Sequence, residues 1–236
     1  MKYILSSSHC ETGTPKLSSK YGMAQMLKAA LGTTDISIVL VAAWPDDFSQ
    51  NDTYADWEKD RFTKEGYNVT GFSLLDSRTA HHAQEYIAGA DLVILSGGHA
   101  PTQNNFFHRI NLPQIMKNYT GTVLAISAGS MNSATTVYVQ PEEPGEATDP
   151  GYRKFLLGLG LTDINILPHY NMVKDNILDG MRLYEDITFT DSMGHSFLVI
   201  PDESFVYGDE TGETLYGPGY ILADGVMTEL YSGAKL

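Results

Sequence analysis

The sequence is poor in cysteine and contains no long apolar run. Its one cysteine, Cys10, excludes an internal disulfide and most cysteine-rich metal sites. No apolar run approaches the length that crosses a bilayer, so we expect a soluble protein without a membrane partner. The segment Met1 to Ser6 carries one positive charge and an apolar run too short for a signal peptide, which predicts a cytoplasmic location.

Basic residues are also scarce. Lysine and arginine number 15 against 29 aspartates and glutamates, which gives a formal net charge of -14. Nucleic acids and anionic membranes require basic surfaces, so neither is an expected partner. The remaining composition is that of a globular protein, with 42% hydrophobic and 19% charged residues. We expect one domain over residues 1–236 and leave a homodimer open.

Apolar segments and helical periodicity alternate along the chain. They predict strands at residues 3–7, 36–43, 69–75, 91–96, 122–126 and 164–167, and helices at residues 16–31, 49–65 and 79–88. Repeated βα units with short connections predict an α/β fold, in which helices cover both faces of a doubly wound, mostly parallel sheet. Ligands of such sheets bind beyond the carboxyl ends of the strands. From Phe197 onward, turn signals at residues 210–212 and 224–225 predict antiparallel hairpins.

The segment Gly121 to Ser130 contains the strongest functional signal. The apolar run 122–126 ends directly at Ser127, and small residues, Ala125 and Gly129, lie two positions before and after it. A strand that turns sharply into a helix needs small neighbours at these positions, and it exposes its corner residue to free backbone N–H groups. The pattern favours Ser127 as a nucleophile. The alternative is a serine that only caps the helix.

A serine nucleophile needs a base, and His169 is the best placed of the seven histidines. It follows the predicted strand 164–167, on the same sheet edge as Ser127. His9 and His99 also follow strand ends and are candidates for lining the pocket. The other four are interpreted as surface or structural residues: His81, His82, His108 and His195.

The acid that orients the histidine is less clearly marked. The segment Gln140 to Glu146 offers Glu142, Glu143 and Glu146, although a solvated acidic loop explains the same residues. No set of histidine, aspartate and glutamate has convincing metal-ligand spacing, so we expect neither a metal nor a cofactor.

Three motifs in this order resemble the serine peptidase family of dipeptidase E and cyanophycinase. They are Leu95 to Gly98, Ala125 to Gly129 and Leu167 to Tyr170, and the resemblance extends over roughly residues 1 to 208. It implies the class I glutamine amidotransferase-like fold, with three layers. It also implies Ser127 as nucleophile, His169 as base, and the N–H groups of Gly98 and Ala128 as the oxyanion hole. Glu146 lies 23 residues before His169, as in the family, and is therefore the expected acid.

The sequence departs from its better known relatives after Gly98. The segment His99 to Phe107 replaces their usual glycine and polar residue, and we expect it to line the pocket, with His99, Gln103 and Asn104 contacting a peptide. Helix capping explains the same amides equally well. In dipeptidase E, an arginine after the catalytic histidine is suited to bind a substrate aspartate. Arg182 is the corresponding candidate, although a surface pair with Glu185 or Asp186 is an alternative.

These observations predict a serine peptidase of small peptides, including Asp-containing ones. The absence of an elbow cysteine argues against glutamine-dependent amidotransfer. An α/β-hydrolase esterase would have its acid and histidine farther from the serine than the intervals of 19 and 42 residues found here. Another alternative is a member of the same fold that is catalytically inactive or acts as an esterase or amidase.

Overall fold

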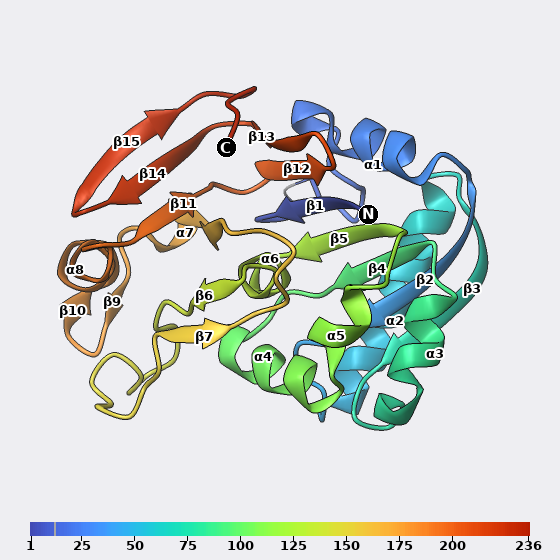
Figure 1. The fold of residues 1–236 in the computed structure, drawn as a ribbon, viewed down its shortest axis with the longest axis horizontal. Helices are drawn as coiled ribbons and strands as arrows, with labels where there is room; N and C mark the ends of the chain where they lie inside the picture. Colours follow the sequence, from blue (N-terminus) through green and yellow to red (C-terminus); the bar gives the residue numbers. More distant parts are fainter. Residues whose placement is uncertain (12) are drawn as a thin grey trace.

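The structure is a computed structural model that describes residues 1–11 and 13–236. Its centre is a seven-stranded sheet in the order β13-β12-β1-β5-β4-β2-β3 (Figure 1). The five parallel strands are β1 (Lys2–Ser6), β5 (Thr122–Ile126), β4 (Leu92–Leu95), β2 (Asp35–Val41) and β3 (Asn68–Leu75). β12 (Phe205–Asp209) runs antiparallel to β1, and β13 (Gly212–Tyr216) antiparallel to β12. The predicted mostly parallel α/β sheet is therefore confirmed.

Helices cover both faces of this sheet because successive side chains of a buried strand point to opposite sides. On one face, side chains such as Val41, Val93 and Leu95 pack against three helices, namely α3 (Ala83–Ala88), α4 (Ala100–Arg109) and α5 (Leu112–Met116). On the other face, Ile38 and Leu124 pack against α1 (Met23–Leu31) and α2 (Phe48–Lys64). The two buried faces hold the strand ends in place.

The first helix begins later than the sequence predicts. Periodicity suggested a start at residue 16, but α1 begins at Met23, after a short 3-10 turn, η1 (Lys20–Gly22). Tyr21 and Gly22 have φ values of 56° and 86°, which an α-helix cannot contain. A second 3-10 turn, η2 (Ala80–His82), precedes α3 in the same way.

A second sheet, in the order β15-β14-β11-β8, adjoins the first. It comprises β8 (Asn165–Leu167), β11 (Ser196–Val199), β14 (Gly219–Ala223) and β15 (Val226–Leu230). The β14–β15 and β12–β13 hairpins confirm the predicted turns at residues 224–225 and 210–212. The sequence did not predict that β11 pairs in parallel with β8.

Short hairpins and helical segments complete the fold. Two small hairpins occur, β6 (Thr136–Tyr138) with β7 (Phe155–Leu157) and β9 (Ile177–Leu178) with β10 (Met181–Arg182). The helical segments are α6 (Ala128–Asn132), α7 (Tyr170–Val173), the π-helix η3 (Leu183–Thr188) and α8 (Phe189–Asp191). They pack around a third apolar cluster that includes Met131, Leu167 and Leu183.

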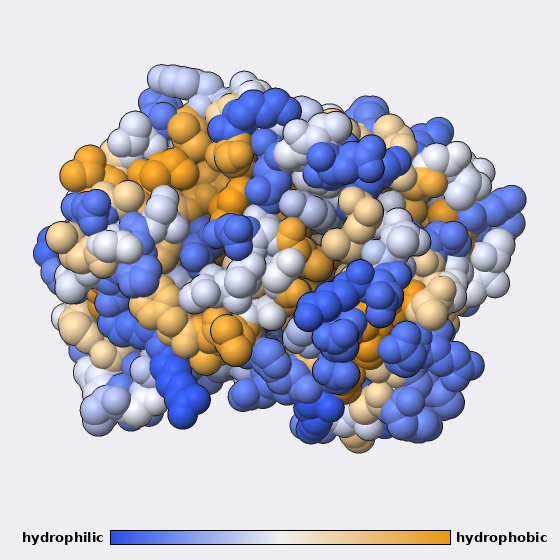
Figure 2. Space-filling model, in the orientation of Figure 1, coloured by the Kyte–Doolittle hydropathy of each residue, from blue (hydrophilic) through white to orange (hydrophobic). Residues whose placement is uncertain are grey.

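Hydrophilic side chains occupy much of the face drawn in Figure 2, as the acidic composition predicts. Apolar side chains gather in its upper left part, over β14 and β15. Among the described residues, no helix combines the length and the apolar character that crossing a membrane requires.

Candidate active site

The turn after β5 places Ser127 at the carboxyl edge of the central sheet. Ser127 has φ 50° and ψ -111°, an uncommon backbone conformation for a residue other than glycine. Its N–H donates a 2.9 Å hydrogen bond to the carbonyl of Ser6 at the end of β1. A side chain at Gly129 would collide with the carbonyl oxygen of Leu95, so this position requires glycine. The predicted strand-turn-helix is therefore present, with Ser127 at its corner.

His169 lies beside Ser127, as the sequence predicts. It follows β8 and has φ 60° and ψ 24°, a left-handed conformation immediately before α7. This conformation turns its imidazole toward the serine, with Nε2 2.9 Å from Ser127 Oγ. The distance is within the range that proton transfer between a hydroxyl and an imidazole requires.

The carboxylate that contacts His169 belongs to Asp202. Its Oδ1 accepts hydrogen bonds from His169 Nδ1 at 2.6 Å and from Ser7 Oγ at 2.7 Å. Ser7 Oγ in turn accepts the backbone N–H of His169 at 2.8 Å. Burial alone would raise the pKa of Asp202, but the hydrogen bonds from His169 and Ser7 hold that pKa below its usual value. The ionised carboxylate thus favours the imidazole tautomer that is protonated at Nδ1 and accepts at Nε2.

The prediction that Glu146 contacts His169 is wrong. Glu146 Oε1 instead accepts a 2.8 Å hydrogen bond from His99 Nε2. Its other oxygen accepts the backbone N–H groups of Glu142 and Glu143 at 2.8 and 2.9 Å. One oxygen therefore ties the loop to His99, the other holds the backbone of the loop itself, and neither is hydrogen-bonded to His169.

Strand pairing explains why Asp202 occupies this place. β11 pairs in parallel with β8, so Val199 lies beside Leu167 and the residues after both strands meet at one edge. The chain then enters β12, which pairs with β1, and so passes the end of β1 at Ser7. Asp202 follows the apolar run 197–200. Its position after a strand is the same signal that selected His169, and this signal could have identified Asp202 as well.

His99 supports the neighbouring loop. Its Nδ1 lies 2.8 Å from Thr102 Oγ1, its Nε2 binds Glu146, and its ring stacks on Trp44 with centroids 5.5 Å apart. The side chain is only 10% exposed. Because both ring nitrogens already have partners, the expectation that His99 binds the substrate directly is not supported.

The predicted substrate amides of Gln103 and Asn104 are buried. Gln103 Nε2 donates to the carbonyl of Ser96 at 2.7 Å. Asn104 Nδ2 donates to Asn132 Oδ1 at 3.0 Å and to the carbonyl of Leu157 at 2.8 Å. The expectation that they contact a peptide is therefore wrong, because both amides face inward and join α4 to its neighbours.

Arg182 is also absent from the residues that line the site. Its guanidinium is exposed and pairs with Asp186, with Nε 3.0 Å from Oδ2 and Nη2 2.6 Å from Oδ1. These bonds keep the pKa of Asp186 low, at about 2. The surface-pair alternative is confirmed, and Arg182 as a substrate ligand is not supported.

Two backbone N–H groups adjoin Ser127, those of Gly98 and Ala128. Gly98 has φ 154°, and a Cβ there would lie 2.6 Å from that of Ala43 and 2.9 Å from Trp44 Nε1. Ala128 is the first residue of α6. Within residues 1–11 and 13–236, neither N–H donates a hydrogen bond to a protein group. Both donors thus remain available, as the oxyanion-hole prediction requires.

Two cavities meet at Ser127 and His169, and Gly98 and Glu142 also line both. The first, which we call the loop cavity, has a volume of about 250 Å³. Its further walls come from the loop 140–144 and from apolar side chains that include Met131, Val173, Ile177, Leu178 and Leu183. The second, the His9 cavity, measures about 520 Å³, and its walls include His9, Trp44, Tyr54, Trp57 and Arg61.

A buried cluster of charges forms one wall of the His9 cavity. Glu58 accepts hydrogen bonds from His9 Nε2, at 3.0 Å, and from Arg61. Burial would lower the pKa of His9, but the Glu58 carboxylate overrides it and raises the pKa to about 9. Burial acts in the opposite direction on Glu58, where His9 and Arg61 hold the pKa at about 2. Two cations around one carboxylate give the cluster of His9, Glu58 and Arg61 a net positive charge at neutral pH.

The residues His99, Glu143 and Glu146 bring potential metal-ligand atoms within 4.8 Å of one another. However, His99 Nε2 and Glu146 Oε1 already bind each other, and Glu143 is exposed. A metal ion would have to break the contacts that close the loop. The trio is therefore better explained as loop support.

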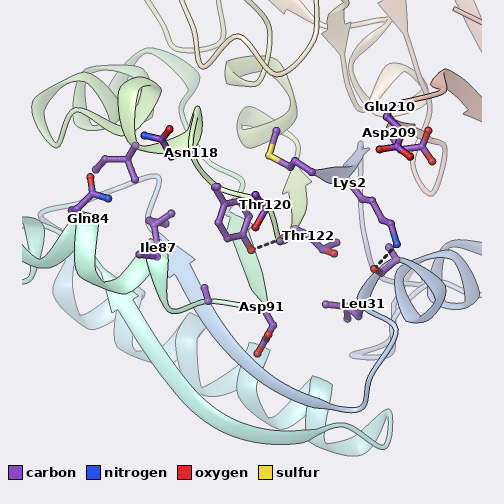
Figure 3. Close-up of a pocket in the computed structure, with 17 residues that line it drawn as sticks. Lys2, Leu31, Gln84, Ile87, Asp91, Asn118, Thr120, Thr122, Asp209 and Glu210 are labelled. Carbon is purple, nitrogen blue, oxygen red and sulfur yellow. Dashed lines mark hydrogen bonds between the residues drawn. The ribbon is translucent and has the colours of Figure 1, made fainter.

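A separate cavity of about 490 Å³ lies at the opposite edge of the sheet (Figure 3). Lys2, Asp91 and Thr122 line it, at the amino ends of β1, β4 and β5. The Lys2 ammonium is already bonded to the carbonyl of Ala30, 3.1 Å away. This cavity shares no residue with the two that contain Ser127.

Comparison with solved structures supports the fold. A peptidase from an acI-B1 Actinobacterium matches 100% of this chain and 96% of its own, with a TM-score of 0.69 and 16% identity. A protein of Listeria monocytogenes EGD-e, described as a peptidase E protein, matches 91% of this chain and 96% of its own, with a TM-score of 0.63 and 12% identity. No curated protein sequence matches the chain significantly.

The family comparison is more specific than the structural one. The model of peptidase family S51 matches residues 5–215, a span that contains Ser127, His169 and Asp202. It therefore includes the elbow, the histidine beside it and the carboxylate that holds the histidine. The chain belongs to peptidase family S51, the dipeptidase E family predicted from its motifs, and it is a serine peptidase.

Proposed function

We propose that the chain hydrolyses small peptides with Ser127 as nucleophile, His169 as general base and Asp202 as the orienting acid. The observation that carries this proposal is the continuous hydrogen-bonded path from Asp202 through His169 to Ser127, with distances of 2.6 and 2.9 Å. Its geometry is that of a nucleophile activated by a base, which is itself oriented by a third group.

In the proposed reaction, His169 Nε2 takes the proton of Ser127 Oγ as the oxygen attacks the scissile carbonyl. Asp202 stabilises the resulting imidazolium through its contact with Nδ1. The imidazolium then gives its proton to the leaving amine, and an acyl-enzyme remains. Water, deprotonated by the same histidine, releases the acid and restores Ser127.

The N–H groups of Gly98 and Ala128 are the proposed donors to the tetrahedral oxyanion. They adjoin the nucleophile from the end of β4 and the start of α6, on two separate elements. A donor that is fixed before the reaction stabilises the developing charge without reorganisation. The positive φ of Ser127 supports this assignment of the two donors, because it places the hydroxyl at the corner between β5 and α6.

The two cavities support a preference for small peptides. Volumes of about 250 and 520 Å³ hold one or a few residues on each side of the scissile bond. The net positive charge of the cluster formed by His9, Glu58 and Arg61 favours an acidic residue in the His9 cavity. We therefore include Asp-containing dipeptides among the proposed substrates, with this cluster in place of Arg182 as the source of the preference.

The decisive experiment combines active-site labelling with a dipeptide panel. A fluorophosphonate probe should label wild-type protein at Ser127, and Ser127→Ala should lose both labelling and dipeptide hydrolysis while keeping its melting temperature. Loss of a triad nucleophile typically lowers kcat on the order of 10⁴-fold or more. Within the panel, Asp-containing dipeptides should be cleaved faster than neutral ones. Hydrolysis of esters but of no peptide would favour the esterase alternative instead.

A further inference from the structure

The end of β1 contacts all three residues of the proposed triad. The carbonyl of Ser6 accepts the backbone N–H of Ser127 at 2.9 Å. The hydroxyl of Ser7, the next residue, donates to Asp202 Oδ1 at 2.7 Å and accepts the backbone N–H of His169 at 2.8 Å. These three partners follow three separate strands, β5, β8 and β11. The end of β1 therefore supports residues that are distant from one another in the sequence.

The hydroxyl of Ser7 is committed to these contacts. A serine hydroxyl has a single proton to donate, and its oxygen can also accept. An ionised carboxylate can only accept, so the proton of Ser7 points at Asp202, and its oxygen faces the N–H of His169. The imidazole itself lies farther away, with Nδ1 3.4 Å from Ser7 Oγ. Ser7 thus acts on His169 directly at the backbone, and at the ring through Asp202.

Ser7 is buried, whereas the side chains that it contacts are partly exposed. Its exposed fraction is 0%, and its N–H donates to the carbonyl of Ser204 at 3.2 Å. The side chains of His169 and Asp202 are 31% and 27% exposed. A carboxylate at a solvent-accessible edge can turn toward water unless a second group fixes it. The Ser7 hydroxyl is such a group, and it binds the same oxygen that faces the imidazole.

Both contacts of Ser7 favour the arrangement that the proposed reaction requires. Burial would raise the pKa of Asp202, but the hydrogen bonds from His169 and Ser7 lower that pKa and keep the carboxylate ionised. The φ of His169, 60°, belongs to the left-handed region, which is unfavourable for residues other than glycine. The hydrogen bond from its N–H to Ser7 stabilises this conformation, which turns the imidazole toward Ser127.

We propose that Ser7 is a positioning residue of the peptidase reaction, whose hydroxyl holds the Asp202 carboxylate against the imidazole and fixes the backbone of His169. This inference rests on the proposed function, because it assumes that Ser127 is the nucleophile and His169 its base. The proton of Ser7 is bound to Asp202, so Ser7 acts on the rate of the chemical step and not on substrate binding. Its loss should therefore lower kcat and leave KM unchanged.

The test compares Ser7→Ala with Ser18→Ala. Ser18 is the matched control because it is equally buried and donates its hydroxyl to a carboxylate, Glu203 Oε2, at the same distance of 2.7 Å. Ser7→Ala should lower both kcat on a cleaved dipeptide and the rate of fluorophosphonate labelling roughly 10- to 100-fold, as expected for the loss of a hydrogen bond to a charged group. KM should change by less than about threefold, and Ser18→Ala should keep both rates. Equal rates in the two variants would overturn the inference.

A double-mutant cycle separates positioning through Asp202 from a general structural role. Ser7→Ala is combined with Asp202→Asn, and the rate of labelling of Ser127 is measured in the wild type, both single variants and the double variant. If Ser7 acts by holding the carboxylate, Ser7→Ala should lower the rate by about threefold or less once the carboxylate is gone. A structural role would lower the rate by the same factor in both backgrounds, because the effects of independent sites are additive. That result would refute the inference.

Urea unfolding and labelling of the wild type complete the test. Ser7→Ala and Ser18→Ala each lose one buried hydrogen bond, so a similar fall in the free energy of unfolding shows that they differ in catalysis and not in folding. If Ser7→Ala does not fold, Ser7→Cys gives the same comparison, because a thiol fills the space but is a weak donor. If the wild type is not labelled at Ser127, the proposed function fails, and this inference fails with it. If Ser7→Ala is labelled as fast as the wild type, only the inference fails.

Discussion

Replacing Asp202 by asparagine tests the proposed triad most directly, because it preserves shape and removes charge. The structure allows two orientations of the new amide. If its oxygen faces His169 Nδ1, the 2.6 Å contact survives, but the imidazolium loses a charged partner. Hydrogen bonds to charged groups are worth about 1.5–3 kcal/mol, so the rate would fall roughly 10- to 100-fold.

If the amide nitrogen faces His169, the loss is larger. A donor at Nδ1 favours the tautomer with the proton on Nε2, which cannot accept the proton of Ser127. Ser7 makes this orientation accessible, since its hydroxyl can accept from the amide as it now donates to Asp202 at 2.7 Å. The same change in other triads costs on the order of 10⁴-fold in kcat, or about 5.5 kcal/mol, and we expect a similar loss here.

The assay is kcat on a cleaved dipeptide, together with the rate of fluorophosphonate labelling of Ser127. Labelling reports nucleophile activation and does not depend on how the substrate is bound. Glu146→Gln is the comparison variant, because Glu146 holds the loop and makes no contact with His169. It should label within about tenfold of wild type. Equal losses in both variants, or less than a tenfold loss in Asp202→Asn, would refute the assignment of Asp202.

Two further predictions concern the framework around the site. Gly129→Ala should destabilise the protein by about 1–3 kcal/mol in urea unfolding, because the added Cβ meets the backbone of Leu95; unchanged stability would contradict the close packing of the elbow. The second prediction concerns pH. The pKa of His9 in the folded protein is about 9, above its ordinary value of 6.5. Charged His9 therefore contributes fully to the free energy of unfolding below pH 6.5, and this contribution is lost as the pH rises to 9. The free energy of unfolding should therefore fall over this interval, by about 3 kcal/mol at most, and His9→Gln should lack that fall. Identical pH profiles of the two proteins would show that the Glu58 contact does not stabilise charged His9.

Most of the fold was predictable because its signals are local. A buried parallel strand is a continuous apolar run, and the run 122–126 agrees with β5 at both ends. Helix ends were less predictable, as Tyr21 shows. Its positive φ depends on how the preceding segment packs and not on the periodicity that extended the helix to residue 16.

The residues of the candidate site likewise include some that were predictable from the sequence and some that were not. Ser127 and His169 were selected because each follows a strand, and the structure places them in contact. For Gln103 and Asn104 the prediction was wrong because the polarity of a residue does not indicate which way its side chain points. Their amides are hydrogen-bonded to groups in the protein interior. A polar residue in a helix faces a cavity or the interior according to the packing of its neighbours.

The sequence by itself determined the family, the parallel sheet and the corner at Ser127, because each depends on residues that are adjacent in the chain. Tertiary structure decided which carboxylate contacts His169. Glu146 was the nearer choice by sequence, but its oxygens are bonded to His99 and to the backbone of its own loop. Asp202 reaches the imidazole because β11 pairs with β8 and β12 returns beside β1. Such pairing joins residues that are distant in sequence, and the position of a carboxylate after a strand does not tell which carboxylate touches the imidazole.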